Sequence, residues 1–261
     1  MKTTSQLTQH ILGLTTIAAL ASLPLQAAVT AFDTDPDIAG SWENNTYTGS
    51  TGTATWNAGD QDLDLAVGTG TSWAVLSETV ATRAADESVT LDIKSVSATF
   101  TFTTPPFNVD FALVGITLSS TGSPALQDGT PHYTFSLRGT LYVGGAQDWF
   151  YQILDGENPV NVIYAGMNFL VPTDTTTLAI ERNGDEYDFL ANGSVIYTSA
   201  GSYTAAQNDS MANYHIAYAS GTYTTFNATV DNFGTIAVPE PSSTALLGLG
   251  GLALMLRRKR S

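Results

Sequence analysis

Two groups of aspartates have a spacing that could bind a metal ion. In each group three carboxylates occupy alternate positions, which places them on one side of an extended strand and allows a loop to wrap them around a cation. Oxygen ligands of this kind are those that calcium prefers. Neither group has the glycine and the glutamate of an EF-hand loop, and a solvated acidic edge is the alternative for both. The groups are Asp33, Asp35 and Asp37, and Asp60, Asp62 and Asp64.

Carboxylates paired for glycoside hydrolysis are harder to find. Such enzymes use two carboxyl groups, one as acid and one as base or nucleophile. Glu186 and Asp188 are two positions apart and could share a strand face, but they follow a tight turn, where solvated charge is the ordinary explanation. His132 and His215 are the histidines of the body, and no serine lies in a nucleophile-elbow motif. We expect no catalytic residues; a Ser-His-Asp site is an alternative that nothing in the sequence favours.

An exposed aromatic side chain would allow glycan binding, because the C–H face of a sugar stacks on a ring while neighbouring polar groups take its hydroxyls. Trp149 and Tyr151 are the candidates, since Gly144, Gly145 and Asp148 predict a loop just before them. In a β-sandwich most tryptophans belong to the core, so packing is the alternative. We predict that Trp149 is exposed and that Trp149 and Tyr151 contact glycan.

The elements that must position these residues are predicted to be strands. The clearest signal is a meander, in which segments 178–182, 187–191 and 195–198 are separated by Asn183-Gly184 and Asn192-Gly193. Asn-Gly accepts the positive φ angles of a type I′ turn, whose twist matches the flanking antiparallel strands. Alternation of apolar and polar residues continues through most of the body. Roughly twelve strands in one body predict an all-β fold, a two-sheet antiparallel jelly-roll sandwich.

Two stretches resemble the concanavalin A-like and laminin-G-like jelly rolls. Residues 177–198 are similar to the central hairpins of those domains, and residues 230–233, Val-Asp-Asn-Phe, resemble their closing strand. The resemblance implies a jelly-roll fold in a superfamily that contains glycan binders, glycoside hydrolases and adhesion modules. It also implies a structural calcium site where the first and last strands meet, formed by Asp33, Asp35 and Asp231.

The C-terminus carries three features in a fixed order: the tetrapeptide Val238-Pro239-Glu240-Pro241, an apolar segment and a basic end. This arrangement resembles the PEP-CTERM sorting signal of bacterial envelope proteins. The resemblance implies recognition by exosortase, a membrane protease or transpeptidase. The apolar positions of the membrane segment are Ala245, Leu246, Leu247, Leu249, Leu252, Leu254 and Leu256. The cytoplasmic basic tail consists of Arg257, Arg258, Lys259 and Arg260.

The apolar segment is short for a membrane span. Its twelve residues, Ala245 to Leu256, extend about 18 Å as a helix, against a hydrocarbon core of about 30 Å. The positive-inside rule places the basic tail in the cytoplasm and the body outside. We expect a transient anchor in the inner membrane before C-terminal processing; a permanent anchor is the alternative.

The N-terminus predicts a secretory signal peptide. Lys2 precedes a mostly apolar stretch, residues 11–25, and Leu25-Gln26-Ala27 ends in the small residue that signal peptidase requires. We predict cleavage after Ala27, with cleavage after Ala28 equally allowed. The expected organisation is a signal peptide at residues 1–27, a β-sandwich domain at 28–237, and a sorting and anchor segment at 238–261.

Removal of both ends leaves a strongly acidic body. It keeps four of the nine Lys and Arg residues and 23 of the 24 Asp and Glu residues, a formal charge of −19. Such a surface repels nucleic acid and anionic membranes, so we expect no nucleic-acid partner. The chain has no cysteine, and a body of this length can be stabilised by its own core without disulfides.

These features predict an exported, non-catalytic protein of the cell surface or the extracellular matrix, which binds glycan or forms part of that matrix. Its processing partners would be signal peptidase and exosortase, and its ligand an extracellular polysaccharide. One alternative is an extracellular glycoside hydrolase or lyase with a divergent active site. The other is a purely structural matrix protein without a ligand.

Overall fold

The computed structural model describes most of the body of the protein. The described residues are 28–46, 52–70, 72–78, 83, 87–100, 109–121, 130–142, 147–156, 161–169, 173–199 and 203–237. Contacts between them belong to one compact unit, residues 27–236. Within these ranges no helix is long and apolar enough to cross a membrane. The predicted signal peptide and the sorting segment at 238–261 lie outside the described residues.

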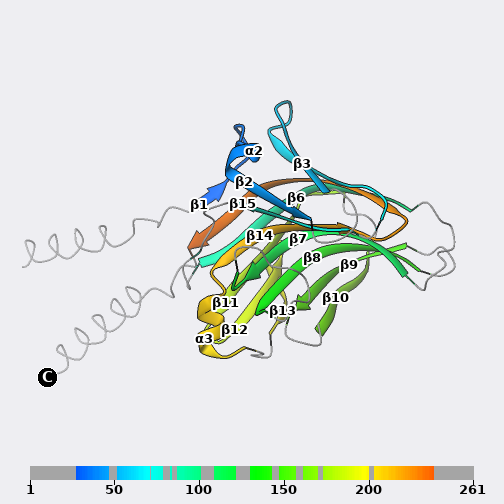
Figure 1. Ribbon diagram of the computed structural model, residues 1–261. Coiled ribbons are helices and arrows are strands. Elements are labelled where there is room, and N and C mark those ends of the chain that lie inside the picture. The colour runs from blue at the N-terminus through cyan, green and yellow to red at the C-terminus, as the bar shows by residue number, and fades with distance from the viewer. Residues whose placement is uncertain are drawn as a thin grey trace, which may run out of the picture. The chain divides into compact units, whose positions relative to one another are not determined.

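An eight-stranded antiparallel sheet forms one layer, with the order β13-β12-β11-β6-β15-β4-β3 and with β1 paired to β15 (Figure 1). Its strands are β1 (Ala28–Thr30), β3 (Gly52–Asn57), β4 (Asp62–Val67), β6 (Glu87–Phe100), β11 (Thr176–Asn183), β12 (Glu186–Ala191), β13 (Ser194–Thr198) and β15 (Thr224–Ala237). The first and last strands of the body therefore pair with each other.

A seven-stranded antiparallel sheet forms the second layer, with the order β10-β9-β8-β7-β14-β5-β2. Its strands are β2 (Trp42–Thr46), β5 (Ser72–Glu78), β7 (Val109–Ser119), β8 (His132–Tyr142), β9 (Gln147–Asp155), β10 (Asn161–Phe169) and β14 (Asn213–Ser220). The described part of the chain also contains two short helices, α2 (Ile38–Ser41) and α3 (Ala205–Ser210).

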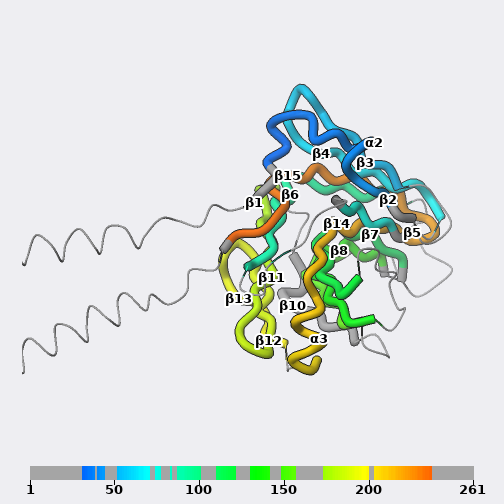
Figure 2. The backbone as a smooth tube through the Cα atoms, turned by 60° about the vertical axis from the view of Figure 1, so that its left-hand side comes forward, coloured from blue at the N-terminus to red at the C-terminus, as the bar shows by residue number. Residues whose placement is uncertain are grey.

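The main core lies between the two sheets. Alternate residues of each strand point into it, as the period of two in a strand requires. Leu91 and Phe189 of the eight-stranded sheet meet Phe135 and Ile116 of the other in one cluster of buried side chains. The ring of Tyr133 lies 5.4 Å from that of Phe189, centroid to centroid. The two layers are visible as separate sets of strands in Figure 2. The predicted all-β jelly-roll sandwich is confirmed.

The predicted meander is present as β11, β12 and β13. Asn192 and Gly193 both have positive φ angles, 50° and 75°, as a type I′ turn requires. At the first turn β11 continues through Asn183, and Gly184 adopts a φ of 68°. The Asn-Gly pairs thus located both hairpins of the meander, although the first tight turn consists of Gly184 and Asp185.

The seven-stranded sheet has a second face, turned away from the core, which we call the outer face. A smaller cluster of buried apolar residues lies on it, formed by Val75, Leu113, Leu154, Ala217 and Ala219. These residues alternate with the core residues of the same strands. Both faces of this sheet therefore exclude water over part of their area.

Candidate functional site

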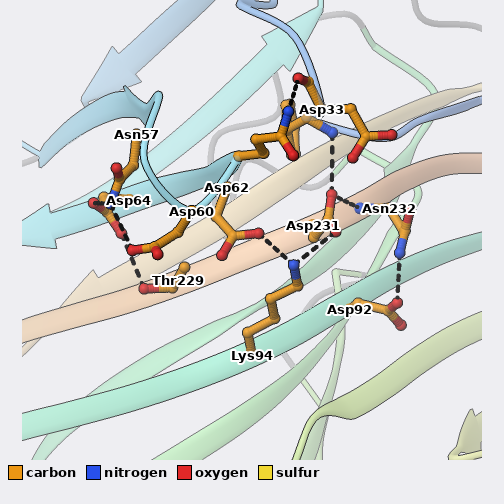
Figure 3. Close-up of polar contacts among 12 residues, drawn as sticks. Asp33, Asn57, Asp60, Asp62, Asp64, Asp92, Lys94, Thr229, Asp231 and Asn232 are labelled. Atoms are coloured by element: carbon orange, nitrogen blue, oxygen red, sulfur yellow. Dashed lines mark hydrogen bonds and ion pairs between the residues drawn. The ribbon is translucent and has the colours of Figure 1, made fainter.

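The acidic residues near the first and last strands surround a lysine. Lys94 of β6, Asp62 of β4 and Asp231 of β15 come from three adjacent strands of the eight-stranded sheet. The Lys94 ammonium lies 2.5 Å from Asp62 Oδ1 and 3.0 Å from Asp231 Oδ2 (Figure 3). The carboxylate side chains are 8% and 9% exposed. We call these three residues the lysine triad.

The second oxygen of Asp231 holds the backbone. Asp231 Oδ1 accepts hydrogen bonds from the N–H of Phe32 at 3.0 Å and from the N–H of Asn232 at 2.8 Å. Burial raises the pKa of Asp231, but the hydrogen bonds from Lys94 and from these two amides outweigh it, so the net pKa is below the ordinary value. Hydrogen bonds to Asp62 and Asp231 raise the pKa of Lys94. Both charges are therefore stabilised by the fold.

The predicted calcium set is not brought together around a cation. Asp33 and Asp35 are exposed, and the Asp35 carboxylate accepts the N–H of Asp37. Asp231 instead shares its carboxylate with the Lys94 ammonium. Among the residues that the structure describes, no group of three or more acidic or histidine side chains has the arrangement of a metal site. The Lys94 ammonium thus neutralises Asp231, one of the three residues that the resemblance assigned to calcium.

The second aspartate group is engaged by neighbouring side chains. Asp64 accepts hydrogen bonds from Thr229 Oγ1 at 2.9 Å and from Asn57 Nδ2 at 3.3 Å. Asp60 is exposed and accepts from the same Asn57 amide at 3.2 Å. Asp62 belongs to the lysine triad. Asp64 therefore joins β3, β4 and β15, Asp60 binds within the β3–β4 hairpin, and Asp62 joins β4 to β6.

The prediction that Trp149 is exposed is wrong. Trp149 is 3% exposed and belongs to the main core. Its indole packs over Gly139 of the neighbouring strand, where an added Cβ would lie 2.8 Å from the ring. Gly144 and Gly145 suggested a loop, but β9 begins at Gln147, so Trp149 already follows the strand's alternation toward the core. The missing side chain of Gly139 is the signal that could have indicated this packing.

Tyr151 shares the inward-facing side of β9 with Trp149. It is half-buried, and its ring centroid lies 6.0 Å from that of Phe135. Burial raises its pKa. A glycan contact by Tyr151 would therefore have to involve the edge of a ring that packs on the core.

The carboxylates considered for hydrolysis lie at the end of a hairpin. Glu186 is exposed, and Asp188 is half-buried. Asp188 accepts a hydrogen bond from Thr198 Oγ1 at 2.5 Å across the β12–β13 pair. Burial, and then the charge of Asp188, raise the pKa of Glu181 on the adjacent strand. This geometry has the features of a solvated cross-strand network.

A row of polar side chains crosses the outer face of the seven-stranded sheet. We call it the polar row, and sequence reasoning missed it because its members come from five strands. Each is buried apart from half-buried Arg138. Hydrogen-bonding side chains at alternate positions of apolar strands are the signal that could have found it. The polar row consists of Ser77, His215, Ser119, Thr117, Thr134, Ser136, Gln152, Arg138 and Thr140.

One end of the polar row is organised by His215. Ser119 Oγ donates to the carbonyl of Thr121 at 2.5 Å, so it can only accept from His215 Nε2, which lies 3.1 Å away. The Nε2 nitrogen then carries the proton, and Nδ1 accepts from the Ser77 hydroxyl at 2.7 Å. Burial lowers the pKa of His215 to about 4. The imidazole is therefore neutral at physiological pH.

The other end of the polar row is organised by Arg138. Its Nη1 donates to Gln152 Oε1 at 3.0 Å and its Nε to Thr140 Oγ1 at 3.3 Å. The guanidinium carbon lies 4.5 Å from the centroid of the Phe111 ring, a cation–π contact. Phe111 and Arg138 are both half-buried. They place an aromatic ring and a donor group together where the row meets solvent.

Ser136 lies between these ends. It is opposite Gln152 on β9 and Gly115 on β7. Its side chain is fully buried, yet its hydroxyl has no hydrogen-bond partner among the residues that the structure describes. A buried hydroxyl without a partner costs stability, because water would have satisfied it in the unfolded chain. The neighbouring Thr117 and Thr134 hydroxyls, in contrast, bind each other at 2.8 Å.

Comparison with known families supports the prediction for the C-terminus. Residues 237–260 match the model of the PEP-CTERM protein-sorting motif, so the resemblance of this segment is confirmed. The motif implies an exported protein that is processed by exosortase and has a C-terminal anchor. The comparison with curated proteins gives no match.

Comparison with solved structures supports the fold. A structure reported for endo-acting O-glycanases, which prominent members of the human gut microbiota express to initiate mucin breakdown, aligns with a TM-score of 0.51 and 16% identity. The alignment covers 82% of this chain and all of the other. The legume lectin-like domain from Entamoeba histolytica aligns with a TM-score of 0.48, 7% identity and coverage of 79% and 96%. Bacillus licheniformis β-glucanase aligns with a TM-score of 0.46 and 11% identity, and the alignment covers 81% of this chain and 98% of the other.

Proposed function

We propose that the mature body is a cell-surface or extracellular-matrix protein that binds a neutral glycan through the polar row, without hydrolysing it. The sorting motif supports delivery outside the cell. The observation that carries the binding proposal is the Ser136 hydroxyl, which is buried in the row and has no partner within the described part of the chain. A sugar hydroxyl would satisfy it.

The groups in the polar row suit a carbohydrate. Hydroxyl, amide, imidazole and guanidinium groups can donate to or accept from sugar hydroxyls in fixed directions. At the half-buried end Phe111 offers an apolar ring beside the Arg138 donors. We propose that the ligand enters the row from this end, with Phe111 as its aromatic contact in place of Trp149.

The charge of the body supports a neutral rather than an acidic glycan. The body carries four basic and 23 acidic residues. Their summed field lowers the local concentration of polyanions. Neutral hexose polymers do not meet this repulsion, and the row contains a single guanidinium with which an anion could pair.

A glycan-array screen of the exported mature protein, with and without calcium, tests the proposal. We expect binding to neutral glycans in both conditions. Reducing-sugar release from a bound glycan would contradict the non-catalytic part and favour the hydrolase alternative. If no glycan on the array were bound, the result would favour a purely structural matrix protein.

Ser136→Ala separates binding from stability. Removal of an unsatisfied buried hydroxyl leaves the melting temperature of the free protein unchanged or raises it. The same change should weaken glycan binding by about tenfold, which corresponds to about 1.4 kcal/mol. Unchanged affinity with an intact fold would contradict the role of the row.

Arg138→Gln tests the half-buried end, and Arg182→Gln is its matched control. Both remove one positive charge, but Arg182 lies on β11 of the eight-stranded sheet and pairs with Asp209 of α3. We expect Arg138→Gln alone to weaken binding. Equal losses from both variants would point to net charge and contradict a site at Arg138.

A further inference from the structure

The N-terminal strand of the body pairs with the strand that leads into the sorting motif. Ala28 lies opposite Thr235, Val29 opposite Gly234 and Thr30 opposite Phe233 in the β1–β15 ladder. The family match for the sorting motif begins at residue 237. The two predicted processing regions are therefore adjacent to one strand pair.

β1 and β4 pair with successive stretches of β15. β6 occupies one side of β15 and β4 the other. β4 pairs with residues 226–230 of β15, and β1 pairs with residues 233–235. Between these two stretches Asn232 adopts a φ of 49°, an irregular conformation for a strand. Without β1, the last residues of β15 would present unpaired backbone groups on that side.

The chain after β1 is anchored at several points. Phe32 is fully buried, and its N–H donates to Asp231 Oδ1 at 3.0 Å. Trp56 Nε1 donates to the carbonyl of Phe32 at 2.9 Å. Gln61 Nε2 donates to the carbonyl of Asp33 at 2.7 Å. Figure 3 shows the contact between Asp231 and Lys94 at this junction. The lysine triad thus holds the N-terminal segment against β15.

We infer that the docked N-terminal segment, residues 28–33, acts as a lock that confines the C-terminal processing cut to bonds after Ile236. Proteases commonly take their substrates as extended strands whose backbone groups they bind themselves. Residues 233–235 pair with β1 in a strand that also neighbours β6, and they include the buried Phe233 and Thr235. Ile236 is 41% exposed and lies beyond the last β1 pair.

The chemistry of the step is an ordinary cleavage of a peptide bond. The backbone C–N bond breaks, and the sorting segment leaves with the new amine. The acyl group at the end of the body forms a bond to water, giving a carboxylate, or to an acceptor amine, giving an amide. While β1 is docked, this cut leaves β15 and its contacts intact. When β1 is detached, bonds between Phe233 and Ile236 become substrates as well.

The test uses the full chain, expressed in cells that contain exosortase, and measures both ends of the exported product by intact-mass spectrometry. Val29→Pro with Thr30→Gly disrupts β1, because proline lacks the N–H and glycine weakens a strand. Val29→Thr is the matched control, which keeps a strand-forming residue. We expect the wild-type protein and V29T to end at Ile236 or beyond, and V29P/T30G to yield additional C-terminal ends at residues 233–235.

Two results would overturn the inference: a wild-type product that ends before Ile236, or an unchanged single end in V29P/T30G. If V29P/T30G does not accumulate, Asp231→Ala is the second variant, since it leaves the sequence of β1 unchanged but weakens its docking by removing the acceptor of the Phe32 N–H. The same additional ends are expected from D231A, and their absence counts against the lock. None of these results depends on glycan binding.

Discussion

Asp231 links Lys94 to the start of the folded body. One of its oxygens lies 3.0 Å from the Lys94 ammonium, and the other accepts the N–H of Phe32 at 3.0 Å. A single carboxylate on the last strand thus neutralises a charge from β6 and orients the chain that follows β1. Because the Asp231 carboxylate is buried, water competes little for its hydrogen bonds to Lys94 and Phe32.

Lys94→Met should destabilise the protein. The change leaves the carboxylates of Asp62 and Asp231 together with little solvent. Because Lys94 is itself 37% exposed, we expect a loss of about 1 to 2 kcal/mol rather than the larger cost of a fully buried pair. Urea unfolding measures it. Arg182→Gln, which breaks a pair whose partner Asp209 is 67% exposed, should cost less, under about 1 kcal/mol; equal losses would contradict the argument.

Calcium should stabilise a Lys94→Gln variant more than the wild-type protein. In the wild-type protein the ammonium occupies the space between Asp62 and Asp231. Its removal frees two oxygen-donor groups on neighbouring strands, which a divalent ion can screen. Melting curves with millimolar calcium and with a chelator measure the difference. A calcium-dependent rise in the wild-type melting temperature that Asp231→Ala abolishes would instead support the site expected from the sequence.

The neutral, buried state of His215 should make the protein less stable in acid. Burial lowers its folded pKa to about 4, while the unfolded pKa is about 6.5. The stabilising contribution is complete above the unfolded pKa and is lost as the pH falls toward 4, because the unfolded chain then binds the proton more tightly. The maximum slope is about 1.4 kcal/mol per pH unit.

His215→Gln isolates this contribution from that of the carboxylates. Urea midpoints measured between neutral pH and pH 4 should fall less steeply in the variant than in the wild-type protein. If the urea midpoints of the two proteins fell equally with pH, the folded and unfolded forms of His215 would not differ in protonation in this range.

Gly139→Ala should disturb the core around Trp149. The added Cβ would lie 2.8 Å from atoms of the indole ring, which is closer than van der Waals contact. Overpacking of this kind costs about 1 to 3 kcal/mol. The unfolding free energy and the near-UV circular dichroism of tryptophan measure the effect. Gly68→Ala is the control, since nothing lies within 4 Å of its added Cβ; similar losses in both variants would contradict the packing argument.

The sequence located the features that depend on neighbouring residues. Asn192 and Gly193 supply the positive φ angles of a tight turn, and the hairpin there is confirmed. The C-terminal motif is likewise read from contiguous residues and is confirmed by the family match at 237–260. Alternation of polar and apolar residues was enough to predict two packed antiparallel sheets.

Alternation could not say which face of a strand meets the other sheet. Trp149 and Gln152 of β9 are both buried, one in the core and the other in the polar row of the outer face. When both faces of a strand carry apolar or neutral residues, the pattern loses its contrast. The exposed Trp149 was predicted from the glycines before it, which indicated a loop, and alternation could not correct this; the tertiary structure places Trp149 inside.

The sequence by itself determined the local turns, the strand-rich fold class, the acidic charge and the C-terminal sorting motif. The tertiary structure decided which distant residues meet: Lys94 with Asp62 and Asp231, Ser77 with His215, and β1 with the end of β15. The physical reason is one of range. Turn geometry and periodicity depend on a few neighbouring residues, whereas the long-range contacts depend on strand order and register, which exist only once the chain has folded.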